Sequence, residues 1–251
     1  MDRMVGSGTF SQVYKAMDTE REAVVAVKVV ELKKIEEMKI HDLFWEELKI
    51  IKKLRHPNIV TCFEYFRTVN NCYSVYEYCD GGDLSQVLKK GALGDRDTLT
   101  QANRIIRDVY RGLLYLESVN VVHRDIKAAN ILLSRGRAKL GDFGFATKCN
   151  REFKDASIGS PAYMAPEALV HNIYGPKTDV WGFGMLLYEM LHGESPYANC
   201  ESEAELKDKV QVPISWDQLK GSLPSPLKRL ILKCLQVDFL HRPNFSELKN
   251  D

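Results

Sequence analysis

The sequence predicts an α+β fold in which strands dominate the N-terminal part and helices the C-terminal part. Runs rich in β-forming residues occur at 23–30, 60–66 and 72–78. Beyond them, the long apolar patterns have helical spacing, most clearly over 98–117. At 251 residues, the chain is long enough for one large domain or for two lobes with a cleft between them.

Composition and charge are those of an ordinary globular protein, with 45% hydrophobic and 27% charged residues. A net charge of +1 argues against a general nucleic-acid or membrane-surface binder. No apolar run is long enough to span a bilayer, and the first residues lack the apolar core of a secretory signal. The six cysteines have no metal-binding spacing, so we expect free thiols in the cytoplasm, with the nucleus as the alternative.

The first element is a predicted hairpin over 6–13, Gly-Ser-Gly-Thr-Phe-Ser-Gln-Val. Two glycines between β-forming residues let the backbone approach a ligand closely, and its N–H groups can cradle phosphate oxygens. The next strand, 23–30, carries one lysine, Lys28, which by itself is most simply a solvated side chain. A single charged helix is predicted over 33–54, ended by Pro57.

The most informative stretch runs from His123 to Asn130, with Asp142-Phe143-Gly144 close behind it. Two apolar segments between them predict a strand, a turn and a second strand, so Asp125, Asn130 and Asp142 would meet at the mouth of one hairpin. Asn130 and Asp142 offer the hard oxygen ligands that Mg²⁺ takes alongside phosphate oxygens. Asp125 is placed to accept a proton from a hydroxyl.

This stretch closely resembles the catalytic loop and Asp-Phe-Gly motif of eukaryotic protein kinases. Other motifs of that family occur in the same order along this chain: the glycine hairpin, the Lys28 strand, Ala165-Pro166-Glu167 and the tail around Arg242. The resemblance therefore covers nearly the whole chain. It implies a bilobal fold, with a β-rich N-lobe containing one long helix over 1–78 and a larger, mainly helical C-lobe over 79–251. Both ends lie close to family motifs, so we expect a domain taken from a longer protein.

The resemblance implies an ATP site between the lobes. Lys28 would orient the α- and β-phosphates, and Glu47 would hold Lys28. The adjacent Glu46 competes for this role, but successive helical residues are about 100° apart, and Glu47 shares the side of the apolar residues. The implied nucleotide contacts are Gly6, Ser7, Gly8, Val13, Ala26, Lys28, Tyr76, Glu77, Cys79, Asp83 and Leu132.

Within this set, Tyr76 would limit the depth of the pocket, and backbone groups of Glu77 and Cys79 would bond the adenine edge. Three roles stay open for Asp83: binding the ribose hydroxyls, binding a basic residue of a peptide, or capping the helix predicted over 84–90.

For catalysis, the resemblance implies that Asp125 accepts the substrate proton and Lys127 steadies the γ-phosphate, while Asn130 and Asp142 hold Mg²⁺. The full predicted catalytic set is Asp125, Lys127, Lys28, Glu47, Asn130 and Asp142. Lys127, together with Gly-Ser-Pro before Tyr163, is typical of serine/threonine kinases. We therefore expect a protein substrate with a serine or threonine acceptor, ATP and Mg²⁺ as cofactors, and a regulatory partner or flanking domain.

Other residues have implied structural roles. His123 would pack in the core with Phe143 and Ile51 rather than act as a base. Asp179 would hold the backbone of the His123-Arg124 turn, and Arg242 would pair with Glu167 in the interior.

The segment before Ser160 departs from the usual pattern, because the commonest phospho-acceptor position holds Ala156. Asp155 supplies a fixed negative charge, and Ser157 is one place away. We therefore expect activity without phosphorylation at the usual position, which Arg124 would otherwise clamp.

Two other functions compete with a protein kinase. A pseudokinase that binds nucleotide without turnover is favoured by Ser11, where a third glycine is usual, and by Ala156, although neither change removes a catalytic group. A metal-dependent hydrolase using Asp125 and Asp142 is the second. The subfamily stays open between NIMA-related, unc-51-like and sterile-twenty-like kinases.

Overall fold

The computed structural model describes residues 3–7, 11–91, 93, 98–148, 159–219 and 223–250. Gly8 therefore lies outside the described residues, as do Asp155, Ala156 and Ser157. The predictions for these positions stay predictions.

The N-terminal part is a five-stranded antiparallel sheet in the order β1-β2-β3-β5-β4. Its strands are β1 (Arg3–Ser7), β2 (Ser11–Asp18), β3 (Ala23–Glu31), β4 (Cys62–Arg67) and β5 (Asn71–Glu77). The valines of β3 alternate across the sheet, and Val25 and Val27 are buried on one face. This alternation holds β3 in the middle of the sheet and fixes the direction in which Lys28 points.

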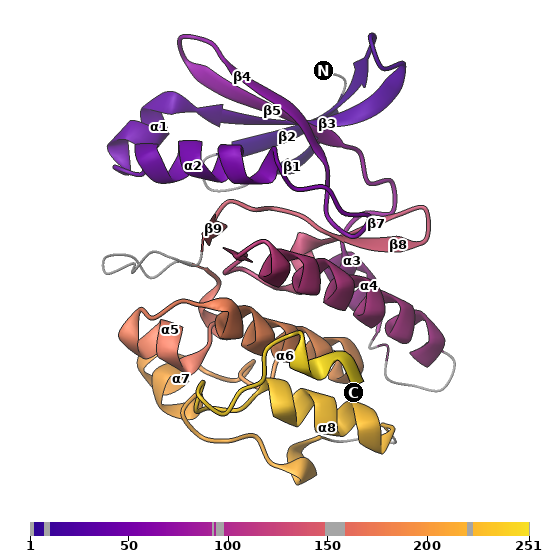
Figure 1. Cartoon of the computed structure of the whole chain (residues 1–251), viewed down its shortest axis with the longest axis vertical. Coiled ribbons are helices and arrows are strands. Elements are labelled where there is room, and N and C mark those ends of the chain that lie inside the picture. Colours follow the sequence, from indigo (N-terminus) through magenta and orange to yellow (C-terminus); the bar gives the residue numbers. More distant parts are fainter. Residues whose placement is uncertain are drawn as a thin grey trace.

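The helix predicted over 33–54 is in fact two helices, α1 (Leu32–Glu37) and α2 (His41–Ile51), which lie along the sheet (Figure 1). Lys39 has a φ of 56°, in the left-handed region that ends a helix. The charged composition of the segment hid this interruption, because both halves favour helix. Phe44, Leu48, Ile50 and Ile51 are the buried face of α2.

The C-terminal part is mainly helical (Figure 1). Its helices are α3 (Leu84–Leu88), α4 (Leu99–Ser118), α5 (Pro166–His171), α6 (Pro176–His192), α7 (Glu203–Lys209) and α8 (Ser225–Cys234). Every residue from Thr178 to Leu187 of α6 is buried, so this helix is the centre of the core. The predicted helices over 84–90 and 98–117 are confirmed within a few residues at their ends.

Two short antiparallel ladders carry the polar motifs. The first pairs β6 (Val121–Val122) with β9 (Thr147–Lys148), and the second pairs β7 (Ile131–Ser134) with β8 (Arg137–Leu140). The β7–β8 hairpin confirms the predicted strand, turn and strand. Hydrogen bonds of 2.8 Å from Gly81 N to Leu133 O and from Leu133 N to Gly82 O tie it to the connection that follows β5. The lobe boundary between 78 and 79 stays a prediction.

Candidate active site

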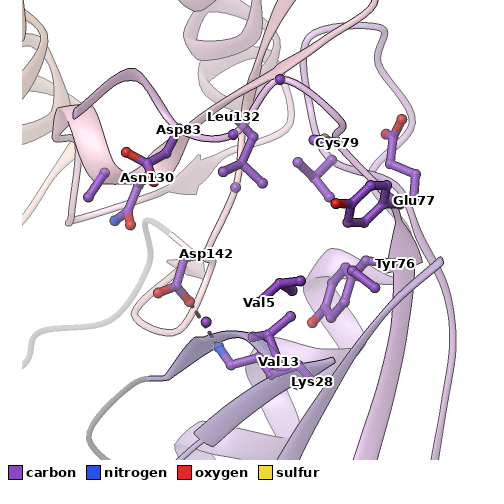
Figure 2. Close-up of a pocket in the computed structure, with 18 of the residues that line it drawn as sticks. Val5, Val13, Lys28, Tyr76, Glu77, Cys79, Asp83, Asn130, Leu132 and Asp142 are labelled. Carbon is purple, nitrogen blue, oxygen red and sulfur yellow. Dashed lines mark hydrogen bonds and ion pairs between the residues drawn. The ribbon is translucent and has the colours of Figure 1, made fainter. Parts of the chain in front are cut away.

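A pocket of about 700 Å³ separates the N-terminal sheet from the β7–β8 hairpin. Every predicted nucleotide contact that the structure describes lines it, so only Gly8 remains unplaced. Val13 and Ala26 supply apolar surface from the sheet, and Leu132 supplies it from the opposite side (Figure 2). Such a mainly apolar cleft with a few polar groups at one end is typical of a small-molecule site.

Lys28 and Asp142 join the two walls of this pocket (Figure 2). The Lys28 Nζ atom lies 2.9 Å from Asp142 Oδ1. No ion pair within 4 Å joins Lys28 to Glu47, although the structure describes both residues, so the predicted contact is not formed here. Glu47 is nevertheless buried, as expected if it, rather than Glu46, faces inward. It is also close enough to Lys28 for the ammonium to lower the pKa of the Glu47 carboxyl.

The pKa shifts of the two carboxyls agree with this arrangement. Burial raises the pKa of Glu47 to about 8, even though the ammonium of Lys28 pulls it down. The same ammonium lowers the pKa of Asp142 to about 2, so Asp142 is the ionised partner at neutral pH. Asp142 has a φ of 46°, and this turn of the backbone presents its carboxylate to the lysine.

The catalytic-loop residues form one hydrogen-bonded cluster around Asp125. Asn130 Nδ2 donates to Asp125 Oδ2 and to its backbone O, both at 2.8 Å, and Lys127 Nζ lies 2.7 Å from Oδ2. The backbone N of Ser160 donates to Asp125 Oδ1 at 3.1 Å, and Lys127 Nζ also donates to Ser160 Oγ at 2.7 Å. Asp125, the predicted base, is therefore buried, and Lys127 lies directly beside its carboxylate.

The contact of Ser160 with Asp125 was not predicted from the sequence, in which Ser160 stands only as part of the Gly-Ser-Pro motif. Its position directly before Pro161 gave no direct sign of this bond. The sequence also missed the ion pair between Lys139 and Glu77 at 3.0 Å, which links the hairpin to the end of β5.

Asp179 fixes the turn that carries Asp125. Its Oδ2 atom accepts a hydrogen bond from His123 N at 2.7 Å, and Oδ1 accepts one from Arg124 N at 2.8 Å. Arg124 has a φ of 68°, so the turn needs such support. The predicted structural role of Asp179 matches these contacts.

His123 lies in the core as the resemblance implied. Its ring centroid is 4.7 Å from that of Phe143, and Nε2 is 3.0 Å from Gly141 O. Ile51 is buried in the same cluster as Phe143.

The predicted interior pair of Arg242 and Glu167 is also present. Two bonds, of 2.6 and 3.0 Å, run from the guanidinium to the Glu167 carboxylate, and both side chains are buried.

Asp83 caps α3. Its Oδ1 atom accepts a hydrogen bond from Gln86 N at 3.1 Å, and Oδ2 accepts one from Gln86 Nε2 at 2.7 Å. Because Asp83 also lines the pocket, capping does not exclude a contact with a ligand. Its direct contact with ribose or peptide stays a prediction.

Asn130 and Asp142 suit a cation that takes only part of its ligands from protein. The Asn130 amide nitrogen is engaged by Asp125, which leaves its carbonyl oxygen as the group able to meet a metal. No group of three or more His, Cys, Asp or Glu residues in the described part of the chain could hold a metal alone. Two oxygen ligands on one side of a pocket fit Mg²⁺ completed by phosphate oxygens and water.

Comparison with known proteins decides the family. The protein kinase domain family matches residues 1–251. The chain belongs to the protein kinase family. This kinase domain is 34% identical to "Serine/threonine-protein kinase STE20" of Candida glabrata over 98% of the chain, and 33% identical to human "Serine/threonine-protein kinase ULK1" over 97%. It is 36% identical to the STE20 protein of Eremothecium gossypii over 98%.

The kinase domain spans about a quarter of the length of these relatives, at 27%, 24% and 25% respectively. Relatives of different names match almost equally well, so the subfamily stays open. No helix among the described residues of the kinase domain is long and apolar enough to cross a membrane.

Proposed function

We propose that this domain transfers the γ-phosphoryl group of ATP to serine or threonine hydroxyls of proteins. The observation that carries the proposal is the cluster around Asp125, in which a buried carboxylate, Lys127 and Ser160 meet beside a pocket spanned by Lys28 and Asp142. A kinase has little covalent chemistry of its own to perform, so positioning and charge neutralisation are the main tasks of the protein.

Each side chain has a task that its contacts support. Asp125 would accept the proton of the acceptor hydroxyl, since Asn130 and Lys127 hold its carboxylate in place. Lys127 is tied to Asp125 and Ser160, and would neutralise charge on the transferred group. Lys28 would exchange Asp142 for phosphate oxygens, and Glu47, buried nearby, would then steady the ammonium.

ATP and Mg²⁺ are the cofactors that protein kinases generally use, and the residues here fit both. Bound Mg²⁺ would offset the negative charge of the phosphates. Asn130 and Asp142 would hold it, while the valine, alanine and leucine side chains of the pocket would cover the adenine.

Partners and a cellular location are part of the proposal. We expect protein substrates and a flanking domain or regulatory partner, since the domain is a quarter of its relatives' length. The described cysteines, Cys62, Cys72, Cys79, Cys200 and Cys234, are all free, which favours the cytoplasm or nucleus over an oxidising compartment.

The test is phosphorylation of casein by the purified domain with Mg-ATP, followed by identification of the modified amino acid. Asp125→Asn should lower the rate by about 10²- to 10⁴-fold. Asp208→Asn, an exposed matched control on α7, should keep the parent rate. Labelling of casein by Asp125→Asn at the parent rate would contradict the proposal, as would phosphotyrosine as the main product.

The same samples test the two competing functions. If Mg-ATP raises the melting temperature but casein is not labelled, the domain is a pseudokinase. Release of phosphate without labelled casein would identify a hydrolase.

A further inference from the structure

Three arginines line one side of α4 beside the β7–β8 hairpin. Arg104, Arg107 and Arg111 are exposed and recur at i, i+3 and i+7, which places them in one sector of the helix. Asp108 borders that sector, and its Oδ2 atom accepts a hydrogen bond from the backbone N of Ala138 at 3.0 Å. The sector therefore runs along β8, which lies directly against α4 (Figure 1).

The tip of the hairpin adds Arg135 and Arg137, both exposed. Asp108 of α4 contacts Ala138 of β8, and Gly112, one turn later on α4, lies against Leu140, two residues later on β8. Helix and strand therefore run in the same direction. It follows that Arg104, earlier on α4, lies toward the hairpin tip. The five residues Arg104, Arg107, Arg111, Arg135 and Arg137 are called the arginine surface below.

No side chain of the arginine surface forms an ion pair with a carboxylate among the described residues. Three acids lie close to it, each with a local partner. Asp80 accepts a bond from Arg135 N, Asp108 accepts one from Ala138 N, and Glu77 pairs with Lys139. The lysines of α7, by contrast, are paired, as in the bridge from Lys207 to Glu203 at 2.7 Å.

The charge of Arg111 also acts on the partly buried ring of His56. His56 stacks on Tyr115 of α4 with ring centroids 5.0 Å apart. Burial lowers the pKa of His56, and the positive charges of Arg111 and Lys139 lower it further. The positive charge of Arg111 therefore extends to the contact between His56 and α4.

We propose that the arginine surface binds an anionic segment of a protein, carrying carboxylate or phosphate groups. The planar guanidinium pairs with either group through two parallel hydrogen bonds. Arg104 and Arg111 are about 10 Å apart along the helix axis, a span that about three residues of extended chain cover. A net charge of +1 gives little long-range attraction for nucleic acid or membranes, which favours a short peptide as the occupant.

Such a segment would act at a distance from the phosphorylation site. A substrate held by the arginine surface raises the effective concentration of its acceptor hydroxyl at Asp125. This consequence rests on the proposed function, whereas binding of the segment does not.

Binding is measured by fluorescence anisotropy on the purified domain. The probes are three ten-residue peptides of the same length, rich in glutamate, phosphoserine or glutamine. Arg107→Gln/Arg111→Gln and Arg135→Gln/Arg137→Gln should each weaken anionic-peptide binding by roughly tenfold or more, because each removes two charged donors. Arg67→Gln/Arg229→Gln removes two exposed arginines elsewhere and should leave binding unchanged. The glutamate and phosphoserine arms show which anion is preferred.

Equal binding of the glutamine peptide, or equal weakening by the control variant, would overturn the proposal. So would arginine-dependent binding to phosphatidylserine vesicles or duplex DNA without peptide binding. Labelling of a neutral acceptor peptide, which lacks the anionic groups that the arginine surface would bind, separates the two proposals. Labelling of a short neutral acceptor peptide should be the same in the parent and in all arginine variants, whereas failure of the proposed function would abolish it in the parent while peptide binding persists.

Discussion

Lys28 pairs with Asp142 across the pocket at 2.9 Å, while Glu47, the partner expected from the sequence, stays buried without an ion pair to this lysine among the described residues. Two carboxylates thus compete for one ammonium. Asp142, with a pKa of about 2, is ionised, and Glu47, with a pKa of about 8, is largely protonated at neutral pH. Phosphate oxygens that engage Lys28 and a metal that engages Asp142 would remove this competition.

The first prediction concerns the pH dependence of stability. The pKa of Glu47 is raised from 4.5 to about 8, so the folded chain keeps a proton that the unfolded chain loses above pH 4.5. The contribution of this group to the free energy of unfolding therefore falls as pH rises toward 8, by up to about 1.4 kcal/mol per pH unit. Urea unfolding between about pH 6.5 and 8 should show a shallower fall with pH in Glu47→Gln than in the parent.

The chosen window excludes the titration of His56, while the raised carboxyls of Asp179 and Glu189 act equally in the parent and the variant. The pKa of His56 is lowered from its ordinary value of 6.5, so its protonation changes stability only at pH values below about 6.5. Glu46→Gln is the matched control, since it removes the adjacent carboxyl, and it should keep the parent slope. Parallel curves for Glu47→Gln and the parent would show that Glu47 is ionised in the folded chain.

The sequence predicted the strands, the long helix α4 and the convergence of Asp125, Asn130 and Asp142, because these depend on local patterns and on one short hairpin. It could not predict which carboxylate pairs with the Lys28 ammonium. The choice of partner depends on how deeply Glu47 is buried, and that burial is set by the packing of α2 against the sheet. The break at Lys39 was equally hidden, since a left-handed residue other than glycine leaves no mark in the sequence.

Asp179 should act as a positioning residue. Asp179→Asn keeps one acceptor oxygen, so either His123 N or Arg124 N loses its bond. The turn would shift Asp125, and kcat should fall by on the order of 10- to 100-fold with KM for ATP nearly unchanged. Steady-state kinetics against ATP would check this, with Asp208→Asn as the exposed control. A variant that loses stability but keeps kcat would show that the turn does not need both bonds.

The buried pair of Glu167 and Arg242 should contribute to stability in a strongly non-additive way. Glu167→Gln leaves the guanidinium without its charged partner and should cost about 3–5 kcal/mol in unfolding free energy. Arg242→Met should cost a similar amount, because Lys177 O and Gln236 O also lose their donor. The double variant Glu167→Gln/Arg242→Met should cost clearly less than the sum of the two single variants.

Urea unfolding of the four proteins gives the coupling energy directly. Lys207→Gln, which breaks an exposed pair on α7, is the control and should change stability far less. Additive losses in the buried cycle would mean that the two side chains contribute independently.

Gly184 should be required by the packing of α6 against α8. A Cβ atom there would lie 2.7 Å from the Cβ of Cys234 and 2.9 Å from Leu235 Cδ2, and the first of these cannot move without its helix. Gly184→Ala gains about 1 kcal/mol of helix propensity, but the overpacked contact should outweigh it and leave a net loss of about 1–2 kcal/mol. Gly175→Ala, with nothing within 4 Å of the new atom, is the control. Thermal unfolding of both variants decides the matter, because a melting temperature for Gly184→Ala at or above that of Gly175→Ala would mean that α8 yields to the added methyl group.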